Sequence, residues 1–236
     1  MKVEIWSDVM CPFCYIGKRK FEKALNEFPD KNNIEIIWKS FQLDPTTVTD
    51  PGLNTVDHLA AKKGWSKEQA AESISYVSNI AKQVGLDFHF EKAVVANSFD
   101  AHRLSHLAKK YGKQNDLEEK LFSAYFTEGK NTADHNTLSQ IASEIGLDAT
   151  EVSTLLKSDQ YADKVEEDIY QAQQVGVRGV PFFVLDRKYA VSGAQESDTF
   201  LQALTRAFDE HKKENKVELI QTGNTSDSCG PDGCEI

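Results

Sequence analysis

The start of the chain alternates short apolar runs with one amphipathic stretch. Residues 2–6 (KVEIW) are rich in β-forming side chains and predict a strand. Residues 34–41 (IEIIWKSF) predict a second strand, apolar enough to be buried on both faces. Between them, apolar side chains at helical spacing predict a helix that must end before Pro29; these side chains are Cys14, Phe21, Leu25 and Phe28. Strand, helix and strand in this order indicate one βαβ unit.

Residues 54–175 lose the strand pattern and show helical periodicity instead. Three apolar stripes recur at intervals of three and four residues: Leu104, Leu107, Ala108 and Tyr111; Leu138, Ile141, Ala142 and Ile145; and Val165, Ile169 and Ala172. Three helical segments end in a glycine followed by an apolar residue, at Gly85, Gly146 and Gly176. This ending predicts a left-handed glycine whose neighbour packs back on the helix. Asp148 with Glu151 fits an N-terminal capping pattern.

Strand character returns towards the end of the chain. Residues 181–185 (PFFVL) and 189–192 predict two strands joined as a hairpin, and residues 197–213 predict a final helix. The order is therefore βαβ, a helical block, then ββα. If the two strand-bearing ends share one sheet, the helical block is an insertion into a single core. Two separate domains are the alternative.

Composition and charge narrow the class of function. Hydrophobic residues make up 40% and charged residues 27% of the 236 residues, as in soluble packed proteins. The formal net charge of −10 argues against a nucleic-acid partner or a membrane surface, because both require basic patches. The first residues show no apolar run or cleavage pattern, so we expect no signal peptide, and the longest apolar stretch, residues 180–185, is far shorter than the ~20 residues of a membrane helix. We therefore expect a cytoplasmic protein whose cysteines are mostly reduced.

Cys11 and Cys14 lie where the first predicted strand gives way to the first predicted helix. Unpaired N–H groups and the helix dipole stabilise an anion there, which favours a thiolate on Cys11. Cys14 lies one turn into the helix, and Pro12 suits the first helical position. We expect an exposed Cys11 to be the nucleophile and a more buried Cys14 to resolve the mixed disulfide. The alternatives are a structural zinc site and an inert pair of core cysteines. A zinc site would need a second ligand pair of suitable spacing, which the sequence does not offer. No metal is predicted.

Two further features offer chemistry but have plainer explanations. Asp8, three residues before Cys11, is a candidate proton acceptor for the cysteine pair or a modulator of its ionisation. The alternative is an aspartate that only ends a strand. His102 and His106 have the i, i+4 spacing of a metal pair, but no acidic HExxH context accompanies them. We therefore place both histidines on the solvated face of an amphipathic helix.

The Cys-Pro-Phe-Cys motif, the long helical block and the segment Gly-Val-Arg-Gly-Val-Pro at residues 176–181 together resemble the DsbA family of thioredoxin-fold oxidoreductases. More closely, the chain resembles the FrnE-like branch of that family, over roughly residues 3–208. The resemblance implies an α/β fold with a discontinuous thioredoxin-like core at residues 1–50 and 176–214. It also implies an all-helical insertion at residues 51–175 and a flexible tail at residues 215–236.

The resemblance implies roles for residues outside the cysteine motif. In the family, the proline matching Pro181 is cis and lies beside the catalytic disulfide. Pro181 would then present the backbone of Val180 to an extended substrate through β-type hydrogen bonds. Asn97 and Arg103 belong to a segment, NSFDAHRL, that faces the thiol site in similar proteins. We include both as candidate substrate-binding residues.

Two features qualify the resemblance. The Pro12-Phe13 dipeptide departs from the Pro-His of the strongly oxidising periplasmic members, so a powerful oxidant is not implied. Cys229 and Cys234 are similar to a second cysteine pair that ends some FrnE-like proteins, and they predict an accessory redox pair. A passive tail and adventitious metal capture are the alternatives for that pair.

The resulting prediction is a thiol–disulfide oxidoreductase that acts on protein or peptide disulfides through mixed disulfides. No organic cofactor is expected, although glutathione is a candidate co-substrate and a cellular reductase a candidate partner. A glutathione-dependent isomerase, such as 2-hydroxychromene-2-carboxylate isomerase, or a kappa-class transferase is the second prediction. Those relatives usually have serine where Cys11 stands and lack the second cysteine. A third is a non-catalytic module that uses the cysteines as ligands. The reaction direction, natural substrate and oligomeric state are not predicted.

Overall fold

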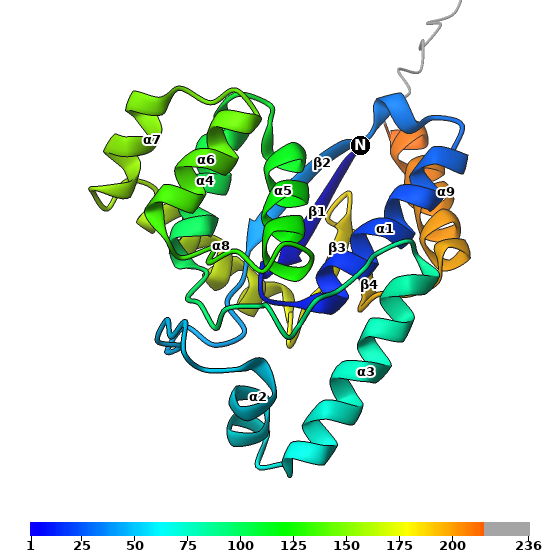
Figure 1. The fold of residues 1–236 in the computed structure, drawn as a ribbon. Coiled ribbons are helices and arrows are strands. Elements are labelled where there is room, and N and C mark those ends of the chain that lie inside the picture. The colour runs from blue at the N-terminus through cyan, green and yellow to red at the C-terminus, as the bar shows by residue number, and fades with distance from the viewer. Residues whose placement is uncertain (215–236) are drawn as a thin grey trace, which may run out of the picture.

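The computed structural model describes residues 1–214 and builds them around a four-stranded sheet with strand order β2-β1-β3-β4 (Figure 1). The strands are β1 (Lys2–Ser7), β2 (Glu35–Ser40), β3 (Phe182–Leu185) and β4 (Tyr189–Ser192). β1 runs parallel to β2 and antiparallel to β3. Strands from both ends of the chain therefore share one sheet, which confirms the predicted α/β fold with helices inserted between its two halves.

The helices fall into two groups. α1 (Pro12–Glu27) and α9 (Ser197–Glu214) flank the sheet and contact each other. A short 3-10 helix, η1 (Lys31–Asn33), precedes β2. The inserted helices are α2 (Thr55–Lys63), α3 (Lys67–Gln83), α4 (Phe99–Lys110), α5 (Gln114–Phe126), α6 (His135–Glu144), α7 (Ala149–Leu156) and α8 (Ala162–Val175).

Alternate side chains of a strand point to opposite faces of the sheet, so apolar side chains lie on both faces. Helices cover both of these faces. On one face, the ring of Phe183 lies 5.4 Å from that of Phe21 on α1 and 4.6 Å from that of Phe200 on α9, between centroids. On the other face, Trp6 lies against α8, and its indole Nε1 donates to the carbonyl of Asp168 at 2.9 Å. The first helix and the last helix thus share one face, and α8 covers the opposite one.

β2 forms one edge of the sheet, and this position overturns one prediction. Glu35 is exposed and Ile36 is only half-buried, so the expectation that the strand is buried on both faces was wrong. α5 partly closes the edge: the Gln114 side chain accepts from the amide of Trp38 and donates to its carbonyl, both at 3.0 Å. An edge strand otherwise leaves such backbone groups unpaired.

The predicted hairpin is confirmed. β3 and β4 pair from Phe182 opposite Ser192 to Leu185 opposite Tyr189. The connecting residues Asp186 and Arg187 take φ values of 52° and 57°. Positive φ at both central positions gives a turn whose twist matches that of the two strands.

The glycine endings of the inserted helices are also confirmed. Gly85, Gly146 and Gly176 have φ values of 77°, 72° and 83°. The amide of the following residue returns to the helix in each case, as in the 2.9 Å bond from Leu147 to the carbonyl of Ala142. A left-handed residue lets the chain reverse here, and glycine adopts it without steric cost.

Two other local predictions had opposite outcomes. The Asp148 side chain accepts from the amides of Thr150 and Glu151 at 3.0 and 2.9 Å, which confirms the N-terminal cap of α7. Tyr111 was predicted to belong to the same apolar stripe as Leu104, but it is 44% exposed, so this prediction was wrong. α4 ends at Lys110, and the Tyr111 hydroxyl instead donates to Glu151 at 2.6 Å.

Within residues 1–214, no helix combines the length and the apolar character needed to cross a membrane.

Gly17 allows α1 to lie close to the loop that precedes β3. A Cβ added at Gly17 would lie 2.9 Å from Cγ of Pro181 and 3.5 Å from Cα of Ala194. Such a short distance cannot be kept without a shift of one element. Gly179 differs, because a Cβ there would meet no atom within 4 Å.

We expect Gly17→Val to lower the free energy of unfolding by about 1–3 kcal/mol, because the added side chain pushes α1 away from Pro181. Urea denaturation of the reduced protein measures the change. Gly179→Ala is the matched control and should stay within about 0.5 kcal/mol of the wild type. Equal midpoints for Gly17→Val and the wild type would contradict the close packing described here.

Candidate active site

Cys11 is the N-cap residue of α1, with extended backbone (φ −94°, ψ 110°), and Pro12 follows in the first turn of the helix. The Cys11 amide donates to the carbonyl of Asp8 at 2.9 Å, and the Cys14 amide donates to the carbonyl of Cys11 at 3.0 Å. This turn places the first cysteine at the amino end of α1 and the second one turn into the helix. Backbone amides at such an end attract negative charge.

Both cysteines are free thiols, and both are buried. Cys11 is 4% exposed and Cys14 is 1% exposed, so the expectation of an exposed Cys11 was wrong. The loop before β3 lies against Cys11, whose Sγ donates to the carbonyl oxygen of Val180 at 3.5 Å. The two thiols nevertheless differ in access, because Cys11 borders a cavity of about 460 Å³ whose lining does not include Cys14.

The loop before β3 supplies the second part of the site. The Val180–Pro181 peptide bond is cis, and Val180 lines the same cavity as Cys11. The carbonyl of Pro181 accepts from the amide of Gly193 at 2.8 Å, which fixes the loop to the end of β4. Val180 and Cys11 are therefore neighbours in the structure although 169 positions separate them in the sequence.

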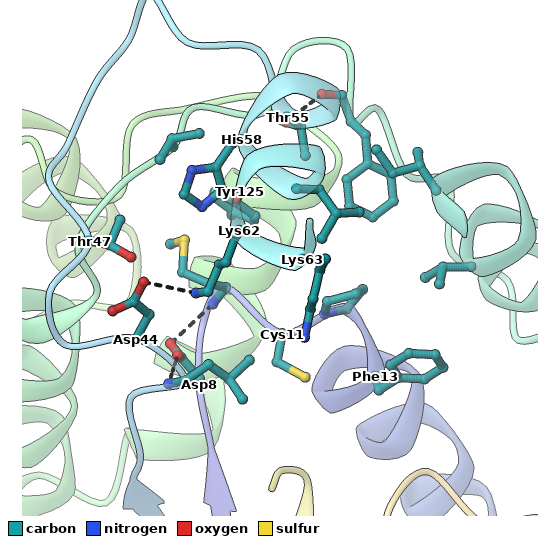
Figure 2. A pocket seen from close by; sticks show the side chains of 18 of the residues that line it. Asp8, Cys11, Phe13, Asp44, Thr47, Thr55, His58, Lys62, Lys63 and Tyr125 are labelled. Carbon is teal, nitrogen blue, oxygen red and sulfur yellow. Dashed lines mark hydrogen bonds and ion pairs between the residues drawn. The ribbon is translucent and has the colours of Figure 1, made fainter. Parts of the chain in front are cut away.

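The cavity lies between the cysteine turn and the α2–α3 pair, and its lining is mostly apolar (Figure 2). Pro12 and Phe13 border it, and Phe13 is 38% exposed. The insertion contributes aliphatic and aromatic side chains to the wall: Leu59, Trp65, Ile74, Val77, Phe90, Val95 and Tyr125. A cavity of this size and character suits a small molecule or part of a peptide.

Asp8 lies at the polar end of the cavity, and it is buried. Its carboxylate accepts from the amides of Met10 at 3.2 Å and Leu43 at 2.8 Å, and His102 Nε2 lies 3.6 Å away. Burial raises the pKa of the Asp8 carboxyl, but His102 and the Leu43 amide lower it more, so the net pKa lies below the usual value. Burial likewise opposes the charged form of His102, but Asp8 raises the pKa of that imidazole above its ordinary value. Both shifts favour the charged forms of the two side chains, as in an internal ion pair.

Cys14 lies in a setting that disfavours its thiolate. Burial raises the pKa of the Cys14 thiol well above its usual value, and the adjacent Cys11 adds to the effect. A thiol of this kind reacts only when another group accepts its proton.

The two histidines of α4 do not lie on a solvated face, so that interpretation was wrong. His102 is buried against Asp8, and Nε2 of His106 lies 3.2 Å from both Asp168 Oδ2 and Ser40 Oγ. This face of α4 packs on α8 and approaches β2, which periodicity alone did not indicate. Over residues 1–214, no group of three His, Cys, Asp or Glu side chains is arranged to hold a metal ion.

Asn97 and Arg103 lie away from Cys11, contrary to the expectation that both face the thiol site. The Asn97 side chain donates to the carbonyls of Pro45 and Thr47 and lines a separate, more polar hollow. The buried Arg103 guanidinium donates to the carbonyls of Leu155 and Gln160 at 2.5 and 2.9 Å. Asn97 thus anchors the loop before α2, and Arg103 closes the carboxyl end of α7.

Sequence reasoning missed the contribution of α2 to the site. His58, Lys62 and Lys63 line the cavity, and Lys62 pairs with Asp44 at 3.0 Å. Burial, with help from Lys62, lowers the pKa of His58, which keeps its imidazole neutral near pH 7. The i, i+4 spacing of His58 and Lys62 was the available signal. Cys229 and Cys234 lie outside the described residues.

We expect Asp8→Asn to lower the free energy of unfolding by about 1 kcal/mol more at about pH 5.5 than at about pH 9. Asp8 has a lowered pKa, so its contribution is present above about pH 3.8. His102 has a raised pKa, so its contribution is complete below about pH 6.5 and is lost as pH rises through the folded value. Urea denaturation across this range measures the effect.

Asp87→Asn is the matched control, because Asp87 forms an exposed pair with His89 at 3.3 Å. Its effect should be small at every pH. Parallel stability profiles of the wild type and Asp8→Asn would show that Asp8 and His102 do not form an ion pair.

Comparisons with known proteins agree with this geometry. The family model for the DSBA-like thioredoxin domain matches residues 2–205. The chain is 27% identical over 213 residues to the uncharacterised protein YwbO of Bacillus subtilis, covering 89% of this chain and 98% of that protein. The crystal structure of a probable DsbA oxidoreductase from Streptomyces coelicolor is 40% identical, with a TM-score of 0.83 over 100% of this chain and 99% of that one.

A more distant structure shares the fold alone. A 2-hydroxychromene-2-carboxylate isomerase is 14% identical, with a TM-score of 0.66 over 92% of this chain and 100% of that one. The fold is thus shared by proteins of different activity. By the match over residues 2–205 and the similarity to the Streptomyces coelicolor structure, the chain belongs to the DSBA-like thioredoxin domain family of oxidoreductases.

Proposed function

We propose that this protein catalyses thiol–disulfide exchange with protein or peptide disulfides. One observation carries the proposal: Cys11 sits at the amino end of α1, borders an open cavity and lies 3.5 Å from the carbonyl of Val180, with Cys14 one turn behind it. A thiolate at a helix terminus beside the half-buried Val180 suits attack on a disulfide in an extended chain. Family membership and the similarity to a probable DsbA oxidoreductase support it.

The proposed reaction has two exchange steps. The Cys11 thiolate attacks one sulfur of the substrate disulfide, forming a mixed disulfide and releasing the other substrate sulfur as a thiolate. The Cys14 thiolate then attacks Cys11, forming the Cys11–Cys14 disulfide and releasing the remaining substrate thiol. Two electrons pass from the protein to the substrate, and the reverse sequence oxidises a dithiol. Val180 would hold the substrate backbone, and Pro12, Phe13 and Pro181 would shape the surface around the sulfur.

We assign Asp8 as the proton acceptor that activates Cys14. Burial leaves the Cys14 thiol protonated, so the second step requires a base. The Asp8 carboxylate is buried, its lowered pKa keeps it ionised near neutral pH, and Asp8 lies three residues before Cys11. His102 would hold the carboxylate in place between turnovers.

The alternative activity, a glutathione-dependent isomerase or transferase, has less support in this chain. Relatives with that activity usually have serine in place of Cys11 and lack the second cysteine, whereas both are present here. We propose glutathione only as a co-substrate and a cellular reductase as a partner, with a cytoplasmic location and no nucleic-acid or membrane partner.

We expect Cys14→Ser to accumulate a mixed disulfide with a substrate peptide, because the resolving thiol is absent. Cys11→Ser should form no such adduct and should lose turnover by at least about 100-fold, because the remaining thiol is buried and protonated. Insulin reduction measures turnover, and intact-protein mass measures the adduct. Turnover by Cys11→Ser at the wild-type rate would contradict the proposal.

The accessory role proposed for Cys229 and Cys234 gives a separate prediction. If this pair shuttles electrons between Cys11–Cys14 and an external reductase, the double change to serine should slow cycling with that reductase. The single-turnover reaction of reduced protein with a peptide disulfide should stay unchanged. Unaltered cycling would show that the tail cysteines are passive.

A further inference from the structure

The α2–α3 pair forms the wall of the cavity opposite Cys11. α2 and α3 contact each other, and α3 also contacts α1. The Thr55 hydroxyl holds α2 to the rest of the insertion by donating to the carbonyl of Phe90 at 3.0 Å, and the pair of Lys62 with Asp44 holds it to the loop after β2. A wall that faces the reactive sulfur contacts whatever is bonded to that sulfur, so its chemistry selects substrates.

The wall is apolar in its depth. Ile74 and Val77 on α3 and Val95 and Tyr125 elsewhere in the insertion line it. At the mouth, Phe13 and Trp65 are 38% and 41% exposed. Exposed aromatic groups at a cavity mouth give contact area to an apolar ligand.

Charge at the mouth is not balanced. Asp8 faces His102 at 3.6 Å and accepts hydrogen bonds from two backbone amides, and Asp44 pairs with Lys62 at 3.0 Å. Lys63 lines the cavity but forms no ion pair or hydrogen bond with any residue in the described range 1–214. In Figure 2 its side chain runs from α2 down towards Cys11. Lys63 is therefore a cation without an ion-pair partner among residues 1–214, on the same cavity as Cys11 and in a chain of net charge −10.

We propose that this cavity selects cysteine-containing peptides that carry a large apolar side chain and an acidic side chain next to the cysteine. The apolar side chain would fill the space against Ile74 and Val77, and the carboxylate would pair with Lys63. The proposal rests on the proposed function, since the peptide reaches the cavity through its bond to Cys11. Glutathione fits less well, because it has no apolar side chain to fill the space against Ile74 and Val77.

The test measures how fast reduced protein attacks peptides whose single cysteine is bonded to 2-thiopyridine. Cys11 forms a bond with the peptide sulfur, the sulfur–sulfur bond to thiopyridine breaks, and the released 2-thiopyridone absorbs light. The peptides contain Leu-Cys-Glu or Glu-Cys-Leu, and the faster order becomes the reference. Further peptides replace Glu by Gln, Glu by Lys or Leu by Ala, and the same adduct of glutathione is included. The uncharged adduct of 2-mercaptoethanol reports reaction that does not involve the wall.

For the wild type, we expect the reference peptide to react about three-fold faster than its Gln counterpart, as for an exposed ion pair. It should react about ten-fold faster than its Ala counterpart, because a leucine side chain leaves water. Lys63→Gln should abolish the preference for Glu over Gln, and Lys63→Glu should favour the Lys peptide instead. Added salt should weaken the charge preference but not the leucine preference.

Lys82→Gln is the matched control, since Lys82 is an exposed lysine near the end of α3 that does not line the cavity. It should keep both preferences. A merely structural role of Lys63 at the end of α2 would change stability but not the ratio of rates. Equal rates for all peptides, a Glu preference that survives in Lys63→Gln, or a faster reaction of the glutathione adduct would overturn the proposal. Absence of reaction with the 2-mercaptoethanol adduct would instead refute the proposed function.

Discussion

The antiparallel pairing of β1 with β3 is the contact on which the site depends. It places Trp6 opposite Phe182, so the chain that leaves β1 towards Cys11 and the chain that enters β3 after Val180 and Pro181 meet at one end of the sheet. The two halves of the site are far apart in sequence, with 169 positions between Cys11 and Val180. α1 and α9 pack on one face of the sheet, and α8 packs on the other. This packing fixes the register of the strands, because a slip of one residue would move every side chain to the opposite face.

The two cysteines differ because of what surrounds each sulfur. Cys11 borders a cavity at the amino end of a helix, whereas Cys14 faces the core, where burial raises the pKa of its thiol. The internal pair of Asp8 and His102 keeps a charged carboxylate beside this apolar core. Charges buried in a low-dielectric interior persist only when they are paired and hydrogen-bonded.

Much of the fold was predictable because its signals are local. Strand runs, the Asp148 cap and the glycine endings depend on residues within a few positions of one another, and the structure confirms them. The positions of Asn97, Arg103 and His102 were not predictable, because periodicity indicates which side of a helix is polar but not which element covers it. Arg103 closes α7, and a buried arginine has no distinctive pattern in sequence. The contribution of α2 and α3 to the cavity was also not predicted, because a lysine in the last turn of a helix, such as Lys63, is common and gives no sign of the element that it faces.

Membership of the DSBA-like thioredoxin domain family and the chemistry of the cysteine turn support one division of labour, in which Cys11 reacts first and Cys14 resolves. Mapping the first site of alkylation tests this division most directly. Reduced protein is treated with less than one equivalent of iodoacetamide at about pH 7, and fragmentation of the peptide that spans both cysteines locates the label. Labelling confined to Cys11 is the predicted result, because the Cys14 thiol is buried and protonated. Equal labelling of the two cysteines, or labelling of Cys14 first, would contradict it.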